Sequence, residues 1–307
     1  MECLSFVKQY FEAGPAPGKT AGGLRLHDGR APLTVGFRGF PPSVVLWLEG
    51  ELLPSFGGVV GRWRKGPPDL QVLSVEREAD VGENQIASWL QPLGLAPGSS
   101  LADGWEPVAV LDALALRAAR GVGTVLLVDP GERCRSSFLP ALVRVLWMLS
   151  AERALAAGTL LLHAGAVLGA RGAILLLGPS GSGKSTLVGN VPPERRLGEE
   201  GVFVRLRRGA AEVRASLWYG GGGGKTAWLP LAGCYVLRKD FALGLTPLPP
   251  IQVLRMLFPG QLHGCAWFGP AEWNTSFALA HRLCGAVPFV ELAFPKDLDP
   301  TTLPPIG

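Results

Sequence analysis

The fold is decided by residues 173 to 188, which read Ala173-Ile-Leu-Leu-Leu-Gly178-Pro-Ser-Gly-Ser-Gly183-Lys184-Ser185-Thr186-Leu187-Val188. The apolar run predicts a buried strand, the glycine-rich segment a loop, and Lys184 the start of a helix. This context accompanies a complete match to the phosphate-binding pattern G-x-x-x-x-G-K-[ST]. We therefore expect the stretch to bind a nucleotide, rather than to form a glycine-rich turn without a ligand.

Residue types within this loop indicate how it would hold a nucleotide. Glycine permits the tight turns that aim successive backbone N–H groups at a polyphosphate. Lys184 would neutralise the β- and γ-phosphates of ATP, and the Ser185 hydroxyl would ligate Mg²⁺. The expected cofactor-binding residues are Gly178, Pro179, Ser180, Gly181, Ser182, Gly183, Lys184, Ser185 and Thr186.

Composition limits the class of protein. The chain has 307 residues, of which 48% are apolar and 18% charged, so it is long and apolar enough for two globular domains. The formal net charge of +4 is small, and the basic runs at residues 62–65 and 205–208 are short, which argues against a nucleic-acid partner. Five widely spaced cysteines without a C-x-x-C pair suit a reducing compartment. The sequence lacks a signal peptide and a membrane-length apolar run, so we expect a cytoplasmic protein without membrane contact.

Residues 1–150 are predicted to form a smaller, β-rich α+β module of unknown role. Between residues 23 and 78, short apolar runs alternate with Gly, Pro and Asp, as in strands joined by turns. Residues 124–129 form a predicted strand that ends in an acid; it precedes the loop, so we interpret it as an ordinary strand and not as a Walker B strand. Predicted helices cover residues 84–93, 108–120 and, capped by Ser136 or Ser137, a long segment to about Ala157.

Residues 151–307 are predicted to form the nucleotide-binding domain. A strand at residues 159–168 is joined to the loop strand by four residues, so the two must pair as an antiparallel hairpin. A short helix after the loop ends at Pro192. Residues 196–206 are predicted as one strand with Glu199 and Glu200 near its start. Further elements are strands at residues 211–217, 229–237 and 289–294, helices at 251–258 and 271–284, and a glycine-rich segment at 220–226 that fits a surface loop or a lid.

With the hairpin, the loop and the paired acids in place, residues 160–297 resemble the catalytic domain of HPr kinase/phosphorylase. In that family a histidine precedes the loop, as in His163-Ala-Gly-Ala-Val here, and two adjacent acids follow it, matched by Glu199-Glu200. The closing segment at residues 282–297 is similar as well. The resemblance implies an α/β P-loop fold of the HPr kinase and phosphoenolpyruvate carboxykinase type, a mixed sheet with an antiparallel hairpin before the Walker A strand.

The same resemblance implies transfer of the γ-phosphate of ATP to a serine or another hydroxyl, in a protein, a peptide or a small metabolite. One of Glu199 and Glu200 would hold the metal and the other would accept the hydroxyl proton, with His163 close to the γ-phosphate. The implied catalytic residues are His163, Lys184, Glu199 and Glu200, and the implied Mg²⁺ ligands are Ser185 and Glu200.

Departures from the family support an alternative. The family acids are usually Asp-Asp, whereas both are Glu here, and the segment between Lys184 and the acids is short. These features would suit a nucleotide-binding regulatory or scaffold protein with a degenerate transfer site. An adjacent acid pair can also be a solvated strand entrance, and a single histidine on an apolar strand a buried structural residue. The sequence does not identify the phosphate acceptor. It also leaves open whether the protein forms a homo-oligomer.

Overall fold

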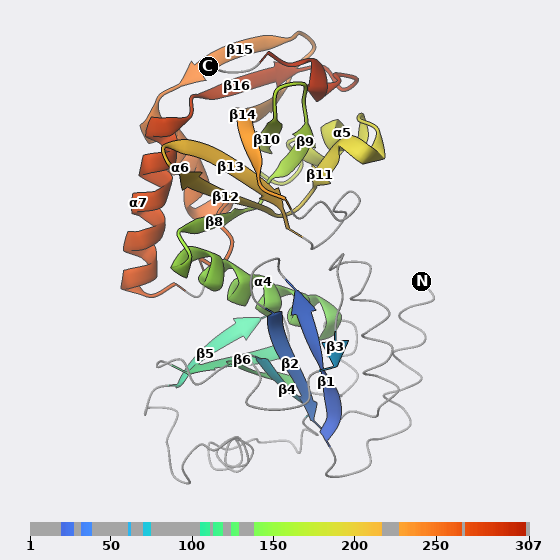
Figure 1. Ribbon diagram of the computed structural model, residues 1–307, viewed down its shortest axis with the longest axis vertical. Helices are drawn as coiled ribbons and strands as arrows, with labels where there is room; N and C mark the ends of the chain where they lie inside the picture. The colour runs from blue at the N-terminus through green and yellow to red at the C-terminus, as the bar shows by residue number, and fades with distance from the viewer. Residues whose placement is uncertain are drawn as a thin grey trace. The chain divides into compact units, whose positions relative to one another are not determined.

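The computed structural model of the protein describes residues 20–27, 32–38, 61–62, 70–74, 105–110, 113–118, 124–128, 138–216, 227–265 and 268–304 (Figure 1). The chain divides into two compact units. The first comprises Met1–Pro54 and Val59–Leu146, and the second Ser55–Gly58 and Trp147–Gly307. Each unit is described below by itself.

The described part of the first unit is a seven-stranded sheet. Its strands are β1 (Thr20–His27), β2 (Pro32–Arg38), β3 (Gly61–Arg62), β4 (Leu70–Ser74), β5 (Trp105–Val110), β6 (Ala113–Ala118) and β7 (Thr124–Val128), in the order β3-β1-β2-β4-β7-β6-β5. The β-rich character expected for this region is therefore confirmed. Two of the short apolar runs between residues 23 and 78, at 44–48 and 59–60, and the expected helix at 84–93 lie outside the described residues.

The helix expected at residues 108–120 is wrong. The chain instead forms the antiparallel hairpin β5–β6, in which Val110 pairs with Ala113, and β6 continues the sheet by pairing with β7. Alanine and leucine favour helices in isolation, but Leu114 and Leu116 also alternate with smaller residues at the strand period of two. Strand pairing on both sides of β6 overrides the local helix propensity. Since β7 belongs to this sheet, it is no neighbour of the strand before the glycine-rich loop at residues 178–183.

The second unit is built on a nine-stranded mixed sheet that curls. Seven strands follow the order β11-β9-β10-β14-β13-β12-β8, and β16 pairs with both β14 and β15. The pairs β10–β14 and β14–β16 are parallel, and the other pairs are antiparallel. The strands are β8 (Thr159–Leu162), β9 (Gly165–Leu168), β10 (Ala173–Leu177), β11 (Arg196–Gly198), β12 (Val202–Arg207), β13 (Ala210–Ala215), β14 (Leu229–Lys239), β15 (Gly244–Leu248) and β16 (Phe289–Phe294).

Helices cover both faces of this sheet. All five residues of β10 are buried, and they alternate between two apolar clusters. Ala173, Leu175 and Leu177 join side chains of α6 (Pro250–Gly260) and α7 (Pro270–Ala286). The intervening residues join Leu187 and Val188 of the short helix α5 (Lys184–Gly189). The uniformly apolar sequence of β10 is thus that of a strand buried on both faces.

The long helix α4 (Phe138–Ala156) agrees with its prediction. Ala151 on this helix packs with Leu161 of β8 and Phe203 of β12. The helices predicted for α6 and α7 and the strands predicted for β13, β14 and β16 are also present. The glycine-rich segment at residues 220–226 lies outside the described residues, so its interpretation as a surface loop or lid stays open.

The predicted hairpin before the loop is confirmed, because β9 pairs antiparallel with β10 from Leu168↔Ala173 onward. However, the expected continuous strand at 159–168 is broken after Leu162, and the one at 196–206 is broken after Gly198. The two breaks face each other, because β8 pairs with β12 and β9 pairs with β11 in nearly continuous antiparallel register. His163 lies in one break and the acid pair in the other.

Within the described parts of the chain, no helix combines the length and apolar character needed to cross a membrane. Cys234, Cys265 and Cys284 are free thiols. Together the two sheets and the helices that cover the second one give a mixed α/β protein.

Candidate functional site

The loop that follows β10 turns sharply three times. Gly178, Gly181 and Gly183 have φ angles of +150°, +78° and +105°, in the left-handed region that glycine adopts without strain. A hydrogen bond from Ser182 N to Pro179 O, 3.1 Å long, closes the turn within the loop. A Cβ atom at Gly178 would lie 2.6 Å from Ser182 Oγ, and one at Gly183 would lie 2.8 Å from Phe294 Cζ. The backbone path therefore depends on glycine at both ends of the loop.

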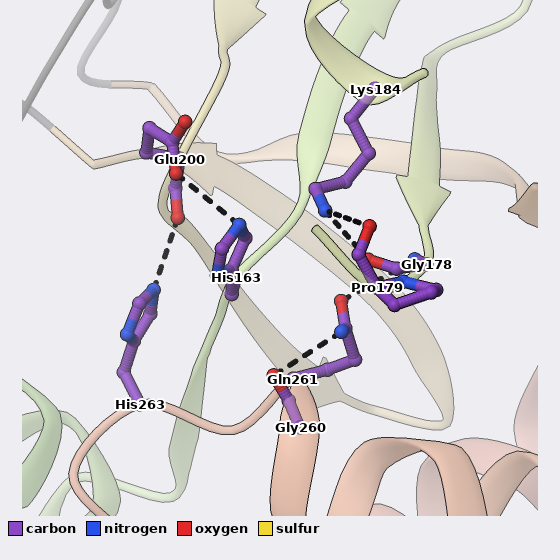
Figure 2. A network of polar contacts seen from close by, with 8 residues as sticks. All are labelled: His163, Gly178, Pro179, Lys184, Glu200, Gly260, Gln261 and His263. Atoms are coloured by element: carbon purple, nitrogen blue, oxygen red, sulfur yellow. Dashed lines mark hydrogen bonds and ion pairs between the residues drawn. The ribbon is translucent and has the colours of Figure 1, made fainter. Parts of the chain in front are cut away.

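Lys184 is the first residue of α5 and is buried, with 6% of its surface exposed. Its ammonium donates to the carbonyl oxygens of Gly178 at 2.6 Å and Pro179 at 3.2 Å, as Figure 2 shows. Among the described residues no carboxylate lies within ion-pair distance of Nζ. Burial lowers the pKa of Lys184, and the nearby charge of Glu200 partly opposes this shift.

His163 and Glu200 form the second part of the site. The Nε2 atom of His163 lies 3.2 Å from Oε2 of Glu200, with 30% and 42% of the two side chains exposed. Burial and then the charge of Lys184 lower the pKa of His163, while Glu200 raises it. A pKa below the usual 6.5 keeps this histidine neutral at neutral pH. Because a carboxylate only accepts hydrogen bonds, the neutral ring suits this contact when its proton is on Nε2.

His263 completes the arrangement and was not foreseen from the sequence. Its ring stacks on that of His163, with centroids 5.5 Å apart and planes 4° from parallel. Its Nε2 atom lies 3.0 Å from the backbone oxygen of Glu200, which can only accept, so Nε2 donates. Trp147 packs edge-on against the same ring at 4.0 Å. The two histidines thus hold the side chain and the backbone of Glu200 (Figure 2).

The segment that carries His263 is tied to the strand break. Leu262 forms an isolated antiparallel bridge with Leu162. His163 N donates to Gln261 O at 2.6 Å, and His263 N donates to Leu161 O at 2.9 Å. Gln261 is 4% exposed, and its Oε1 accepts a long hydrogen bond of 3.4 Å from Gly178 N. Residues 261–263 therefore contact the loop, His163 and Glu200 at once.

The other predicted site residues differ in their surroundings. Pro179, Ser180, Gly181, Ser185 and Thr186 are exposed on the loop and the first turn of α5. Ser182 Oγ is buried, without a hydrogen-bond partner in the described structure. Glu199 is half-buried and, within the described residues, makes no ion pair. The two acids thus differ in their contacts, since Glu200 contacts His163 and Glu199 does not.

No signal in the local sequence identifies Gln261 and His263. The chain has four histidines, and one of them follows Gln261-Leu262 between two predicted helices. Only the pairing of this segment with β8, about a hundred residues earlier, brings it to the loop. No family model matches this chain, and a search of curated proteins finds no significant relative.

Proposed function

We propose that the second unit is a P-loop domain of the HPr kinase type that binds ATP with Mg²⁺ and transfers its γ-phosphate to a hydroxyl group. The acceptor would be a serine in a protein or peptide, or a small hydroxy compound. The observation that carries this proposal is the buried ammonium of Lys184, which touches only neutral carbonyls in the described structure. A buried cation without a counter-charge is costly, and a phosphate group would supply the missing negative charge.

The donors present fit a polyphosphate. Glycine at positions 178 and 183 allows the tight backbone path of the loop, and the buried Ser182 hydroxyl is an available hydrogen-bond donor. The Ser185 hydroxyl offers an oxygen ligand, the type that Mg²⁺ prefers together with substrate phosphates. When bound, Mg²⁺ neutralises charge on the β- and γ-phosphates. The described residues contain no cluster of three His, Cys, Asp or Glu ligands, and a Mg²⁺ site of this kind uses only one or two carboxylates.

Glu200 is the best placed base. Its carboxylate is oriented by His163 and its backbone by His263, and it acts electrostatically on Lys184. In the proposed reaction it accepts the proton of the acceptor hydroxyl while that oxygen bonds to the γ-phosphorus and ADP leaves. Lys184 stabilises the negative charge on the phosphate oxygens. His163, neutral and bonded to Glu200, holds the base in place.

Substitution of Lys184 tests the common premise. We expect Lys184→Ala to weaken MgATP binding roughly 100-fold, the equivalent of about 3 kcal/mol for a lost charged hydrogen-bond donor. Arg207→Ala, which removes an exposed cation from β12, is the matched control and should bind normally. Calorimetric titration measures both affinities. Unchanged ATP affinity in Lys184→Ala would contradict every form of the proposal.

Turnover separates the kinase from the alternative. A kinase releases ADP in the presence of a pool of serine-containing peptides, and this release disappears in Lys184→Ala. A nucleotide-binding regulatory protein binds ATP through Lys184 yet shows no turnover with any acceptor. The Glu side chain at position 200 is longer than the Asp usual in the resembled family, so its carboxylate is displaced. A displacement of about 1 Å can cost on the order of 100-fold in rate, which is the reason to test for binding without turnover.

A further inference from the structure

A pocket of about 430 Å³ adjoins the nucleotide loop. It is lined by Gly183 and Thr186 at the start of α5, by residues 239–241 after β14, and by residues 294–296 after β16. Because β10, β14 and β16 are parallel, their carboxyl ends lie at the same edge of the sheet. Ligands of α/β sheets bind at this edge. The pocket therefore continues the site formed by the loop after β10.

The charged groups of the pocket favour an anionic ligand. Lys239 and Lys296 are both exposed, and within the described residues neither forms an ion pair. Asp240 is the one acid among the lining residues; it pairs with Arg238, whose Nη1 lies 2.8 Å from Oδ2 and whose Nε also lies 2.8 Å from Oε1 of Glu291. The Phe241 backbone N–H fixes the other carboxylate oxygen at 2.7 Å. Two lysines thus remain uncompensated beside Gly183.

Two aromatic residues give the pocket an apolar part. Phe294 is buried, and its ring lies against Gly183. Phe241 is fully exposed, at 102% of its reference area, although a phenylalanine is usually at least partly covered. An exposed aromatic ring at a pocket rim can stack on a flat heterocycle. The volume also falls in the usual range of small-molecule sites, roughly 300 to 1,000 Å³.

We infer that this pocket holds the nucleoside of the nucleotide whose phosphates occupy the loop, with Phe241 stacked on the base. Asp240 retains free lone pairs that accept hydrogen bonds from the ribose hydroxyls, and Lys239 and Lys296 attract the phosphate chain. The inference rests on the proposed nucleotide binding. It adds the residues that distinguish a nucleoside triphosphate from a bare polyphosphate.

The test compares two probes on the full chain, MgATP and inorganic tripolyphosphate with Mg²⁺, by calorimetric titration. The native protein should bind MgATP more tightly. Phe241→Ala should weaken MgATP binding on the order of 5- to 150-fold, the effect of losing one base–aromatic stack, and leave tripolyphosphate binding unchanged. Phe241→Trp should retain MgATP affinity because indole also stacks. Because Phe241 is fully exposed, neither variant should misfold. Melting temperatures equal to that of the native protein verify this.

Two controls separate the possible failures. Phe277→Ala removes another exposed phenylalanine, 53% exposed on α7, and should change neither affinity. Lys184→Ala should weaken both probes, since both carry phosphates. If Phe241→Ala weakens both probes or neither, the nucleoside pocket is refuted while phosphate binding by the loop stands. If the native protein binds neither probe, the proposed function fails and the pocket assignment fails with it.

Discussion

At the scale of single residues, the structure distinguishes two adjacent acids that the sequence could not. Glu200 is held by both histidines, one at its carboxylate and one at its backbone oxygen. Glu199 has no such partner among the described residues. A general base must be fixed within hydrogen-bond reach of its proton, so orientation favours Glu200.

Paired substitutions test this distinction. Glu200→Gln should lower turnover by about 10²- to 10⁴-fold, the usual effect of losing a general base, while an amide oxygen can still accept from His163. ATP affinity should change little. Glu199→Gln is the matched control and should keep most of the activity. Steady-state ADP release gives both values, and a larger loss in Glu199→Gln would reverse the assignment.

His163 should make stability depend on pH below about 6.5. Its folded-state pKa is lowered, chiefly by burial and then by Lys184, so the unfolded chain binds a proton at a higher pH than the native protein does. The free energy of unfolding therefore falls as the pH drops from 6.5 toward the folded pKa, and does not change above 6.5 on this account. His163→Gln should flatten this slope. Urea denaturation across this range measures it, and an unchanged slope would show that burial and Lys184 do not lower the pKa of His163.

At the scale of elements, the apolar pattern predicted most strands and helices of the second unit, but not where the strands bend. Residues on both sides of His163 are buried, so the sequence continues as an apolar run through the break. Beyond the acid pair, the first three residues of β12 are buried as well. The bends arise because each segment changes its strand partner, which is a long-range event. The helix wrongly expected at residues 108–120 has the same origin, because pairing with β7 decided its structure.

The candidate site was predictable only in its local part. The loop and Lys184 follow from a contiguous motif, and His163 and Glu200 from a family resemblance. Gln261 and His263 reach the site through three residues that add to the edge of β8, and no short-range pattern encodes that contact. For the same reason β15, which pairs with β16 along residues 244–248, was not expected.

Gly201 should control the strand break that presents Glu200. A Cβ at this position would lie 3.0 Å from Ser216 Oγ and 3.2 Å from Ser216 Cβ, so Ser216 would have to shift by a few tenths of an ångström. Gly201→Ala should cost about 1 to 3 kcal/mol of unfolding free energy, as overpacking does, and reduce turnover by displacing Glu200. The control Gly285→Ala, at an open position on α7, should stabilise by up to about 1 kcal/mol. Urea denaturation measures the free energy of unfolding of both variants and of the native protein. If Gly201→Ala is as stable as the native protein, the break tolerates a side chain.

At the scale of the whole molecule, the site residues are confined to one unit. The loop, both histidines, Glu200 and the pocket after β14 all belong to the unit that contains Trp147–Gly307. The first unit has its own sheet, and no strand is shared between the two sheets. A ligand stabilises only the folded structure that binds it. Bound nucleotide should therefore raise the unfolding temperature of the second unit alone.

Scanning calorimetry of the full chain tests this independence. Two unfolding transitions are expected, one for each unit with its own sheet. MgATP at 100 times its dissociation constant adds about 2.7 kcal/mol, which should raise one transition by roughly 5 to 10 °C and leave the other in place. Lys184→Ala should abolish the shift without merging the transitions. If both transitions rise together, the two units unfold as one cooperative structure and not independently.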